Sequence, residues 1–186
     1  MQYTCTPHVN TRYNKTTHGL EPKNVDIETQ PKALPKPRPE DVSSPDTIIR
    51  AMYESISGPA GERNWQRLRS LYLDGARLIP TGKRLHQEDG LQVMSIDEWI
   101  EDVQDYFAEN DFYETEIVRH MDRFGDIIQA FSTYETRNKP DSAPMARGIN
   151  GIQLLKYQGR WWIVTVFWVN ESKDNLIPEE FLPYLW

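Results

Sequence analysis

The stretch RGINGIQLLKYQGRWWIVTVFWVNE, residues 147–171, decides the fold class. Its second half, residues 161–169, consists of β-branched and aromatic residues, which are typical of strands, and its first half also carries Ile149, Ile152 and Tyr157. Gln158-Gly159-Arg160 separates the halves and is typical of a hairpin connection. We therefore predict two long antiparallel strands, 147–157 and 161–171. The apolar run 161–169 is too short to cross a membrane as a helix, so no membrane segment is expected.

Two further strands are predicted immediately ahead of this hairpin. Residues 112–120 alternate between apolar and polar side chains, and residues 127–137 are strongly strand-like. Arg123-Phe124-Gly125-Asp126 between them is typical of a turn, and residues 138–144 form a polar loop. The second half of the chain is therefore predicted to be an antiparallel meander of four strands.

The first half of the chain shows helical periodicity instead. Ser44-Pro45-Asp46 is a helix start, and apolar residues then recur at helical spacing up to Ile56. A second, short helix is predicted from Trp65 to Tyr72, followed by a short strand over 76–81. A third helix begins at the capping box Ser95-Ile96-Asp97-Glu98. Helices first and an antiparallel meander last predict an α+β fold.

The acidic side of the third predicted helix allows two interpretations. Acidic residues recur along it from Asp97 to Glu109, opposite an apolar stripe that includes Trp99. A solvated helix face explains this pattern, and a metal-binding carboxylate cluster is the alternative. No His, Asp and Glu spacing in the chain matches a metal motif, so we predict neither a metal nor a cofactor.

Composition limits the classes of partner and compartment. The chain has 186 residues, a net charge of −7 and a single cysteine, Cys5. It lacks the basic footprint of a nucleic-acid binder, so no nucleic acid is expected as a partner. One cysteine permits no intrachain disulfide, and residues 1–20 contain no apolar signal segment, so a cytoplasmic location is expected.

Three regions are predicted along the chain. Residues 1–44 hold six of the 13 prolines and no periodic apolar pattern, which indicates an irregular arm. Residues 45–172 form the folded domain. Residues 173–186 form a tail that ends in several apolar side chains and is expected to pack on the domain or on a partner.

The order of these elements resembles the nuclear transport factor 2-like superfamily, which includes SnoaL-type polyketide cyclases, ketosteroid isomerase and scytalone dehydratase. The resemblance covers roughly residues 46–171 and lies in residues 48–80, 123–135 and 147–163. It implies a cystatin-like cone in which three helices pack on a strongly curved sheet and enclose an apolar small-molecule pocket. It also implies two functional classes: a cofactor-independent lyase, isomerase or cyclase acting on a carbonyl-bearing substrate, or a noncatalytic ligand-binding or protein-interaction module.

The resemblance to ketosteroid isomerase assigns three positions. Tyr53 and Asn150 fall where that enzyme holds the substrate oxygen, so this pair is a candidate for polarising a carbonyl. The alternative is that Tyr53 belongs to the core and Asn150 satisfies a backbone group. Pro80 falls where that enzyme has its carboxylate base, which argues against steroid-type isomerisation.

Strand alternation predicts which side chains line the pocket. If Asn150 faces inward, its own strand also directs Gly148, Ile152 and Leu154 inward. The inward residues predicted on the other strands are Glu114, Glu116, Val118, His120, Gln129, Phe131, Thr133, Glu135, Trp162, Val164, Val166 and Trp168. From these and the third helix we predict the substrate-binding set Trp99, Phe131, Thr133, Val164, Val166 and Trp168.

His120 with Glu135 or Glu116 is the predicted acid–base pair, because a carboxylate beside a histidine orients it and raises its proton affinity. The resemblance to scytalone dehydratase supports this choice only in part, since a single histidine is well placed. The alternatives are that His120 ends its strand in solvent and that Glu135 belongs to a strand-end ion pair.

The adjacent Trp161 and Trp162 are expected to point to opposite faces of the sheet. An outward set of Trp161, Ile163, Thr165 and Phe167 leaves an apolar convex face that requires a cover. We therefore predict a homodimer through this face, with a small-molecule ligand or substrate in the pocket.

Overall fold

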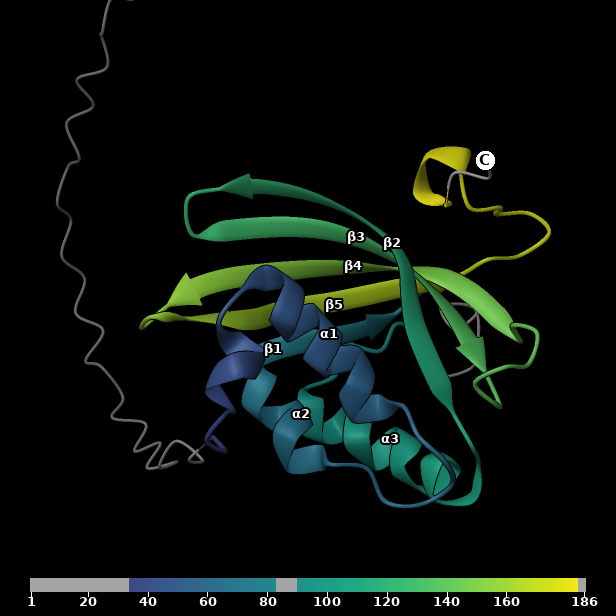
Figure 1. Ribbon diagram of the computed structural model, residues 1–186, viewed down its shortest axis with the longest axis horizontal. Coiled ribbons are helices and arrows are strands. Elements are labelled where there is room, and N and C mark those ends of the chain that lie inside the picture. Colours follow the sequence, from purple (N-terminus) through teal and green to yellow (C-terminus); the bar gives the residue numbers. More distant parts are fainter. Residues whose placement is uncertain (1–33, 83–89, 184–186) are drawn as a thin grey trace, which may run out of the picture. The chain divides into compact units, whose positions relative to one another are not determined.

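Three helices cover one face of a five-stranded sheet in the computed structural model, which describes residues 34–82 and 90–183 (Figure 1). The helices are α1 (Pro45–Ile56), α2 (Trp65–Leu71) and α3 (Ile96–Glu109). The strands are β1 (Tyr72–Pro80), β2 (Tyr113–Phe124), β3 (Ile127–Arg137), β4 (Ala146–Tyr157) and β5 (Arg160–Asn170). Two short 3-10 helices, η1 (Pro39–Val42) and η3 (Glu179–Phe181), flank them. The predicted α+β class is confirmed.

The sheet is mostly antiparallel, in the strand order β1-β5-β4-β3-β2. Only β1 runs parallel to its neighbour, β5. The hairpin between β4 and β5 turns through Gln158 and Gly159, both with positive φ (51° and 76°). Two such residues in succession match the twist of the flanking strands, and Gly159 adopts this conformation without steric cost.

The starts of α1 and α3 follow from their capping residues. Ser44 accepts a hydrogen bond from the Thr47 amide at 3.1 Å, and Thr47 Oγ1 accepts one from the Ser44 amide at 3.0 Å. Ser95 and Glu98 make the same reciprocal pair at the start of α3, at 3.3 and 2.7 Å. Each pair satisfies amide groups that a helix start leaves without intrahelical partners.

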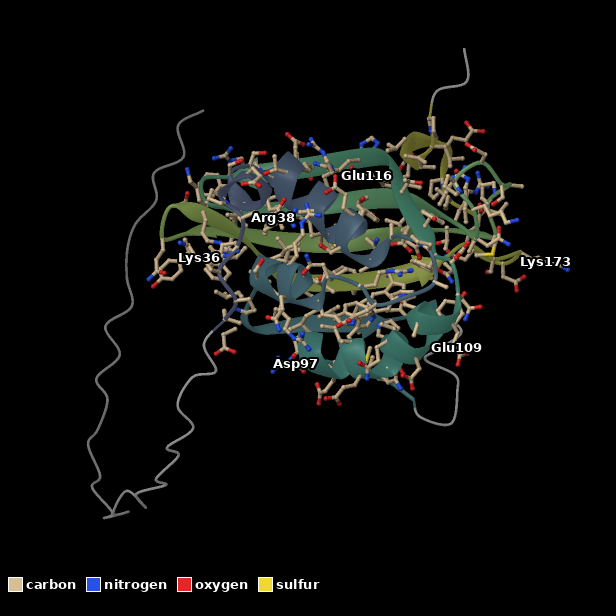
Figure 2. All side chains as sticks on the ribbon, turned by 60° about the horizontal axis from the view of Figure 1, so that its bottom comes forward. Lys36, Arg38, Asp97, Glu109, Glu116 and Lys173 are labelled. Atoms are coloured by element: carbon tan, nitrogen blue, oxygen red, sulfur yellow. The ribbon has the colours of Figure 1, made fainter. Side chains whose placement is uncertain are left out.

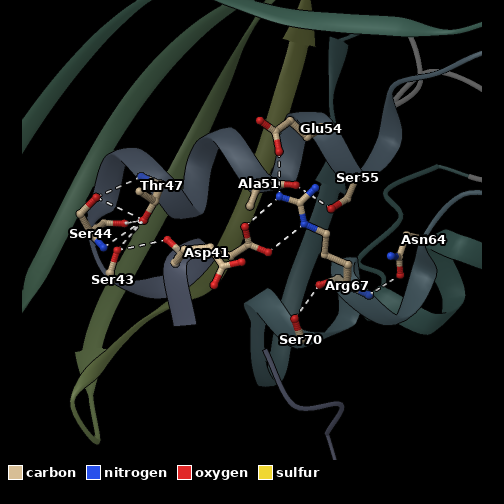
Figure 3. A network of polar contacts seen from close by, with 11 residues as sticks. Asp41, Ser43, Ser44, Thr47, Ala51, Glu54, Ser55, Asn64, Arg67 and Ser70 are labelled. Carbon is tan, nitrogen blue, oxygen red and sulfur yellow. Dashed lines mark hydrogen bonds and ion pairs between the residues drawn. The ribbon is translucent and has the colours of Figure 1, made fainter. Parts of the chain in front are cut away.

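The folded unit begins ahead of the predicted boundary at residue 45. Asp41 and Val42 in η1 are buried, and Asp41 receives two hydrogen bonds of 2.8 Å from Arg67 of α2 (Figure 3). Arg67 also binds Glu54 of α1 at 2.7 Å, so one guanidinium joins three elements. Residues 34–82 and 90–183 accordingly belong to one compact unit. Residues 1–33, which make up most of the predicted arm, lie outside the described residues, together with Cys5, His8, His18 and His86.

The acidic side of α3 is a solvated face, as predicted. Glu101, Asp105 and Glu109 are exposed, and the labelled Asp97 and Glu109 lie on the outer side of the molecule (Figure 2). The apolar side packs inward through Ile100 and Phe107. None of the described helices is long and apolar enough to cross a membrane.

The C-terminal segment lies on the sheet face opposite the helices (Figure 1). Thr133 Oγ1 donates to the Phe181 carbonyl at 2.8 Å, and the Phe181 ring meets His120 and Phe131 edge-on, with centroids 5.1 and 5.5 Å apart. Ile177 is buried, and its amide donates to Glu171 at 3.1 Å. The tail therefore covers part of the outer face of β2 and β3.

Candidate functional site

A cavity of about 300 Å³ lies between the helices and the inner face of the sheet. All three helices and all five strands contribute to its wall. Seven aromatic residues line it: Tyr72, Trp99, Tyr106, Phe107, Phe112, Tyr134 and Trp168. Most of the remaining wall is aliphatic, so the cavity suits an apolar small molecule.

Among residues 34–82 and 90–183, Glu114 is the only one in the cavity wall with a carboxyl or amino group. It lies near the start of β2, and its backbone is held by Ser57, whose Oγ accepts from the Glu114 amide at 2.9 Å and donates to its carbonyl at 3.0 Å. Thr136 Oγ1 donates to Glu114 Oε2 at 3.3 Å. Burial raises the pKa of Glu114 to about 7, while hydrogen bonds from Thr136 and Asn150 act in the opposite direction.

Tyr53 and Asn150 are brought together, as the resemblance implies, but they bind each other. Asn150 Nδ2 donates to the Tyr53 hydroxyl at 3.0 Å, and that hydroxyl lies 2.6 Å from Ser132 Oγ. Asn150 belongs to the cavity wall, whereas the buried Tyr53 does not. Burial, assisted by the charge of Glu114, raises the pKa of the Tyr53 hydroxyl far above its ordinary value. Tyr53 therefore stays protonated and serves to fix the Asn150 amide.

The network continues outward from Ser132 to the protein surface. Ser132 Oγ donates to Glu116 Oε1 at 2.5 Å, and Arg119 donates to the same carboxylate through Nε at 2.7 Å. Arg119 Nη1 also binds Asp46, in the first turn of α1, at 2.7 Å. Glu116 therefore faces inward as predicted, but its charge is neutralised by Arg119.

His120 lies on the outer face, because β2 contains a bulge that the sequence pattern did not reveal. The register against β3 shifts by one residue between Glu116 and Val118, which makes Ile117 the extra residue. Beyond it Val118 and His120 point outward, and His120 is exposed against Phe181. The predicted placement of His120 in the pocket is therefore wrong.

The inward face predicted for β3 is displaced by one residue. The residues that face the helices are Ile128, Ala130, Ser132, Tyr134 and Thr136, all buried. Phe131, Thr133 and Glu135 belong to the opposite face: Phe131 and Thr133 lie under the tail, and Glu135 pairs with Arg137. A one-residue slip reverses every side chain of a strand, so the whole predicted set is lost together.

The inward face predicted for β5 is confirmed only in the second half of the strand. Val166 and Trp168 line the cavity, as does Trp99 of α3. A register shift makes Val164 the extra residue of a second bulge, and Val164 lies outside the lining. In the part of β5 ahead of this bulge, Trp161 and Ile163 are buried, although both were predicted to face outward. Trp162 was predicted to face inward, but its ring packs against the Arg160 guanidinium instead.

The outer face is less apolar than the sequence pattern suggested. Two of the four side chains expected there, Trp161 and Ile163, belong to the core. The tail also covers Phe131 and Thr133. The homodimer through this face stays a prediction.

Gly148 leaves room for the Tyr134 side chain to pass over it, from β3 to β5, beside the cavity. It is paired with Tyr134 on one side and Asn170 on the other, and the Tyr134 hydroxyl donates across it to Asn170 Oδ1 at 2.5 Å. A Cβ at Gly148 would lie 2.5 Å from the Val169 carbonyl oxygen and would also overlap the Tyr134 hydroxyl. Glycine is therefore required here for a close approach.

Replacing Gly148 by alanine is expected to lower the free energy of unfolding by about 1–3 kcal/mol through overpacking. Tyr134→Phe removes the overlapping hydroxyl, so the double variant is expected to lose less than the sum of the two single losses. Urea unfolding followed by tryptophan fluorescence measures all three. Strictly additive losses would show that Gly148 and Tyr134 are not coupled.

Several lining residues were not predicted as site residues. Strand alternation directs Glu114 inward but indicates no role for it, and the one-residue slip on β3 concealed Tyr134 and Thr136. The signal that could have identified Glu114 is an acidic side chain near the start of β2, on the face predicted to point toward the helices. Among the described residues, no three His, Cys, Asp or Glu side chains come together in a way that could hold a metal ion.

The chain has the nuclear transport factor 2-like, cystatin-like fold, which confirms the resemblance at the level of architecture. An NTF2-like protein of unknown function from Pseudomonas putida KT2440 superposes with a TM-score of 0.54 at 8% identity, covering 74% of this chain and 93% of that one. A cystatin-like protein of unknown function from Nostoc punctiforme gives 0.53 at 11%, covering 68% and 87%. The yeast Ubp3-associated protein Bre5 gives 0.51 at 13%, covering 69% and 94%.

No protein-family model matches the sequence, and no curated protein does. At identities of 8–13% the structural likeness defines the fold alone. This fold accommodates different activities, so the function has to be argued from the cavity.

Proposed function

We propose that this protein binds an apolar small molecule in the cavity, with Glu114 as the polar anchor. The observation that carries the proposal is an aromatic cavity of about 300 Å³ whose wall holds a single carboxyl group among the residues that the structure describes. Ligand sites are commonly apolar hollows of this size or larger, with a few polar groups that orient the ligand.

The pairing of the other polar groups supports binding over the predicted catalytic set. Asn150 and Tyr53 bind each other, Tyr134 binds Asn170, and Glu116 is neutralised by Arg119. His120 and Glu135 lie on the opposite face of the sheet, away from Asn150. The proposed acid–base constellation of His120, Glu135, Tyr53 and Asn150 is therefore not assembled in one place.

A thermal-shift screen of small apolar molecules tests the binding proposal. A ligand present at about 100 times its Kd stabilises the fold by about 2.7 kcal/mol, which raises the Tm of a domain of this size by roughly 5–10 °C. Val103→Trp narrows the cavity from α3 and is expected to abolish the shift. Val93→Trp, at an exposed valine outside the cavity, is the matched control and should keep it. Shifts that survive Val103→Trp would place the ligand elsewhere.

Acid–base catalysis on a carbonyl-bearing substrate is the second candidate, and one observation favours it. A carboxyl with a pKa of about 7 exchanges protons readily at neutral pH, which suits a general acid or base. The reaction class would be a cofactor-independent isomerisation, elimination or cyclisation. Hits from the screen, incubated with the protein for hours and analysed by mass spectrometry, separate the candidates: unchanged ligand supports binding, and a product that requires Glu114 supports catalysis.

A further inference from the structure

We propose that the preferred ligand is an organic cation, a protonated amine on an apolar body, held with its ammonium group against Glu114. This inference rests on the proposed binding function and names the chemical class of the ligand. It follows from three features of the cavity: an unpaired carboxyl, unused acceptor capacity on that carboxyl, and walls made of aromatic rings.

Glu114 has no cationic partner among residues 34–82 and 90–183. The nearest arginine on its own strand, Arg119, is engaged by Glu116 and Asp46. Arg63, behind the aromatic wall, donates to backbone carbonyls, and Arg137 pairs with Glu135. An ionised carboxylate in an apolar hollow without a counter-ion is unfavourable, and a bound cation would supply that counter-ion.

The carboxyl also retains room for a donor. An ionised carboxylate offers about four acceptor positions. The described contacts are one hydrogen bond of 3.3 Å from Thr136 and the amide of Asn150. Both are neutral donors, so an ammonium group can add charge-assisted hydrogen bonds, which are shorter and stronger than neutral ones.

The aromatic walls favour the same charge. A cation over the face of a Trp, Tyr or Phe ring within about 6 Å is attracted by the ring quadrupole, and more strongly where water is excluded. α3 contributes Trp99, Tyr106 and Phe107 to the wall, and the sheet contributes Tyr134 and Trp168. An anionic ligand would be repelled by the ionised Glu114 and by the negative faces of aromatic rings.

Glu114 and the titratable groups around it set the pH dependence of cation binding. The titratable groups near it are Tyr53 of α1, Tyr72 of β1 and Tyr134 of β3, with the paired Glu116 further along β2. Burial raises the pKa of Tyr53 and Tyr72, so both hydroxyls stay protonated at neutral pH. An alkylammonium group, like that of lysine, has a pKa of about 10 and stays charged. Cation binding therefore follows the ionisation of Glu114, whose pKa is about 7.

Three probes of one size test the inference: 4-phenylbutylamine, 4-phenylbutan-1-ol and 4-phenylbutanoate, titrated calorimetrically into the protein. At pH 8 the amine is expected to bind at least tenfold more tightly than the alcohol, and the carboxylate not at all. Between pH 8 and pH 6 the amine affinity should fall about tenfold, while that of the alcohol does not fall. Glu114→Gln should remove the preference for the amine, and Glu135→Gln, at a carboxylate on the outer face, should preserve it.

The outcomes separate this inference from the binding proposal. An alcohol that binds as tightly as the amine, a preference for the carboxylate, or a preference for the amine that survives Glu114→Gln overturns the cation assignment and leaves small-molecule binding intact. If none of the three probes binds, the cation assignment fails and the binding proposal loses its support as well.

Discussion

Glu114→Gln is expected to make the protein more stable than the wild type at pH 8, by on the order of 3 kcal/mol. Burial raises the pKa of Glu114 from 4.5 to about 7 in the folded state. The folded protein therefore holds this proton more tightly than the unfolded chain does. The stabilising contribution is complete below about pH 4.5 and is lost as the pH rises through 7. A shift of 2.5 pH units corresponds to roughly 3 kcal/mol, and glutamine cannot ionise.

Urea unfolding at pH 5, 6, 7 and 8, followed by tryptophan fluorescence, measures this effect. Wild-type stability should fall across the series relative to Glu114→Gln, and the difference between the two proteins should be smallest at pH 5. Glu135→Gln is the control, because Glu135 pairs with Arg137 on the outer face and not with a cavity group. A wild type whose stability rises relative to Glu114→Gln over this window would contradict a buried, proton-holding carboxyl.

Arg63→Ala is the second large effect, a loss of about 3–4 kcal/mol in the free energy of unfolding. Arg63 is buried, and its guanidinium donates to the carbonyl groups of four residues in and around the loop after α1: Ile56, Gly58, Pro59 and Gly61. Hydrogen bonds from a charged group are each worth about 1.5–3 kcal/mol, and they do not add when they share one donor group. Removing the guanidinium takes this donor from the carbonyl of the buried Ile56, and it leaves the Gly58 carbonyl with only its bond from the Phe112 amide.

Two variants sharpen this test by urea unfolding. Arg63→Lys is expected to lose most of the free energy of unfolding that Arg63→Ala loses, because a single ammonium cannot reach all the carbonyls that a planar guanidinium contacts together. Arg77→Ala is the matched control: Arg77 also donates to two backbone carbonyls but is exposed, so its loss should stay within about 0.5 kcal/mol. Equal losses for Arg63→Ala and Arg77→Ala would mean that the loop does not depend on Arg63.

The loop that Arg63 holds also supports the cavity. Gly58 pairs with Phe112 through two hydrogen bonds of 2.7 and 3.0 Å, and the adjacent Ser57 binds the backbone of Glu114. Arg63 thereby contributes to the position of the Glu114 carboxyl in the cavity wall. Destabilising this clamp is expected to weaken ligand binding as well as the fold.

The sequence predicted the elements well because local chemistry determines them. Ser44 and Ser95 supply capping hydroxyls that work within one helical turn, and Gln158-Gly159 supplies a turn that needs no distant contact. The fold class followed from the order of these elements.

The site was predicted less well because it depends on strand phase, which is not local. Val164 and Ile117 are ordinary β-branched strand residues, and nothing in their neighbourhood marks them as bulges. On β3, Phe131 faces outward and meets Phe181 of the tail edge-on, a contact across 50 positions that alternation cannot reveal. Strand alternation predicted the inward positions of Asn150 and Trp168 correctly, because no register shift lies in the part of β4 and β5 that contains them.

The bulge at Ile117 divides β2 into two segments that natural variation can alter independently. Glu114, ahead of it, lines the hollow, whereas Val118 and His120, after it, lie on the outer face with the C-terminal segment, so substitutions at the two sets act on different surfaces. Deleting that single residue would remove the bulge but keep the pairing of Val118 with Thr133 and of His120 with Phe131, so the histidine would stay on the outer face. A slip in register that took Ile117 into the regular ladder would instead turn the histidine into the interior, because every side chain after that residue would change face.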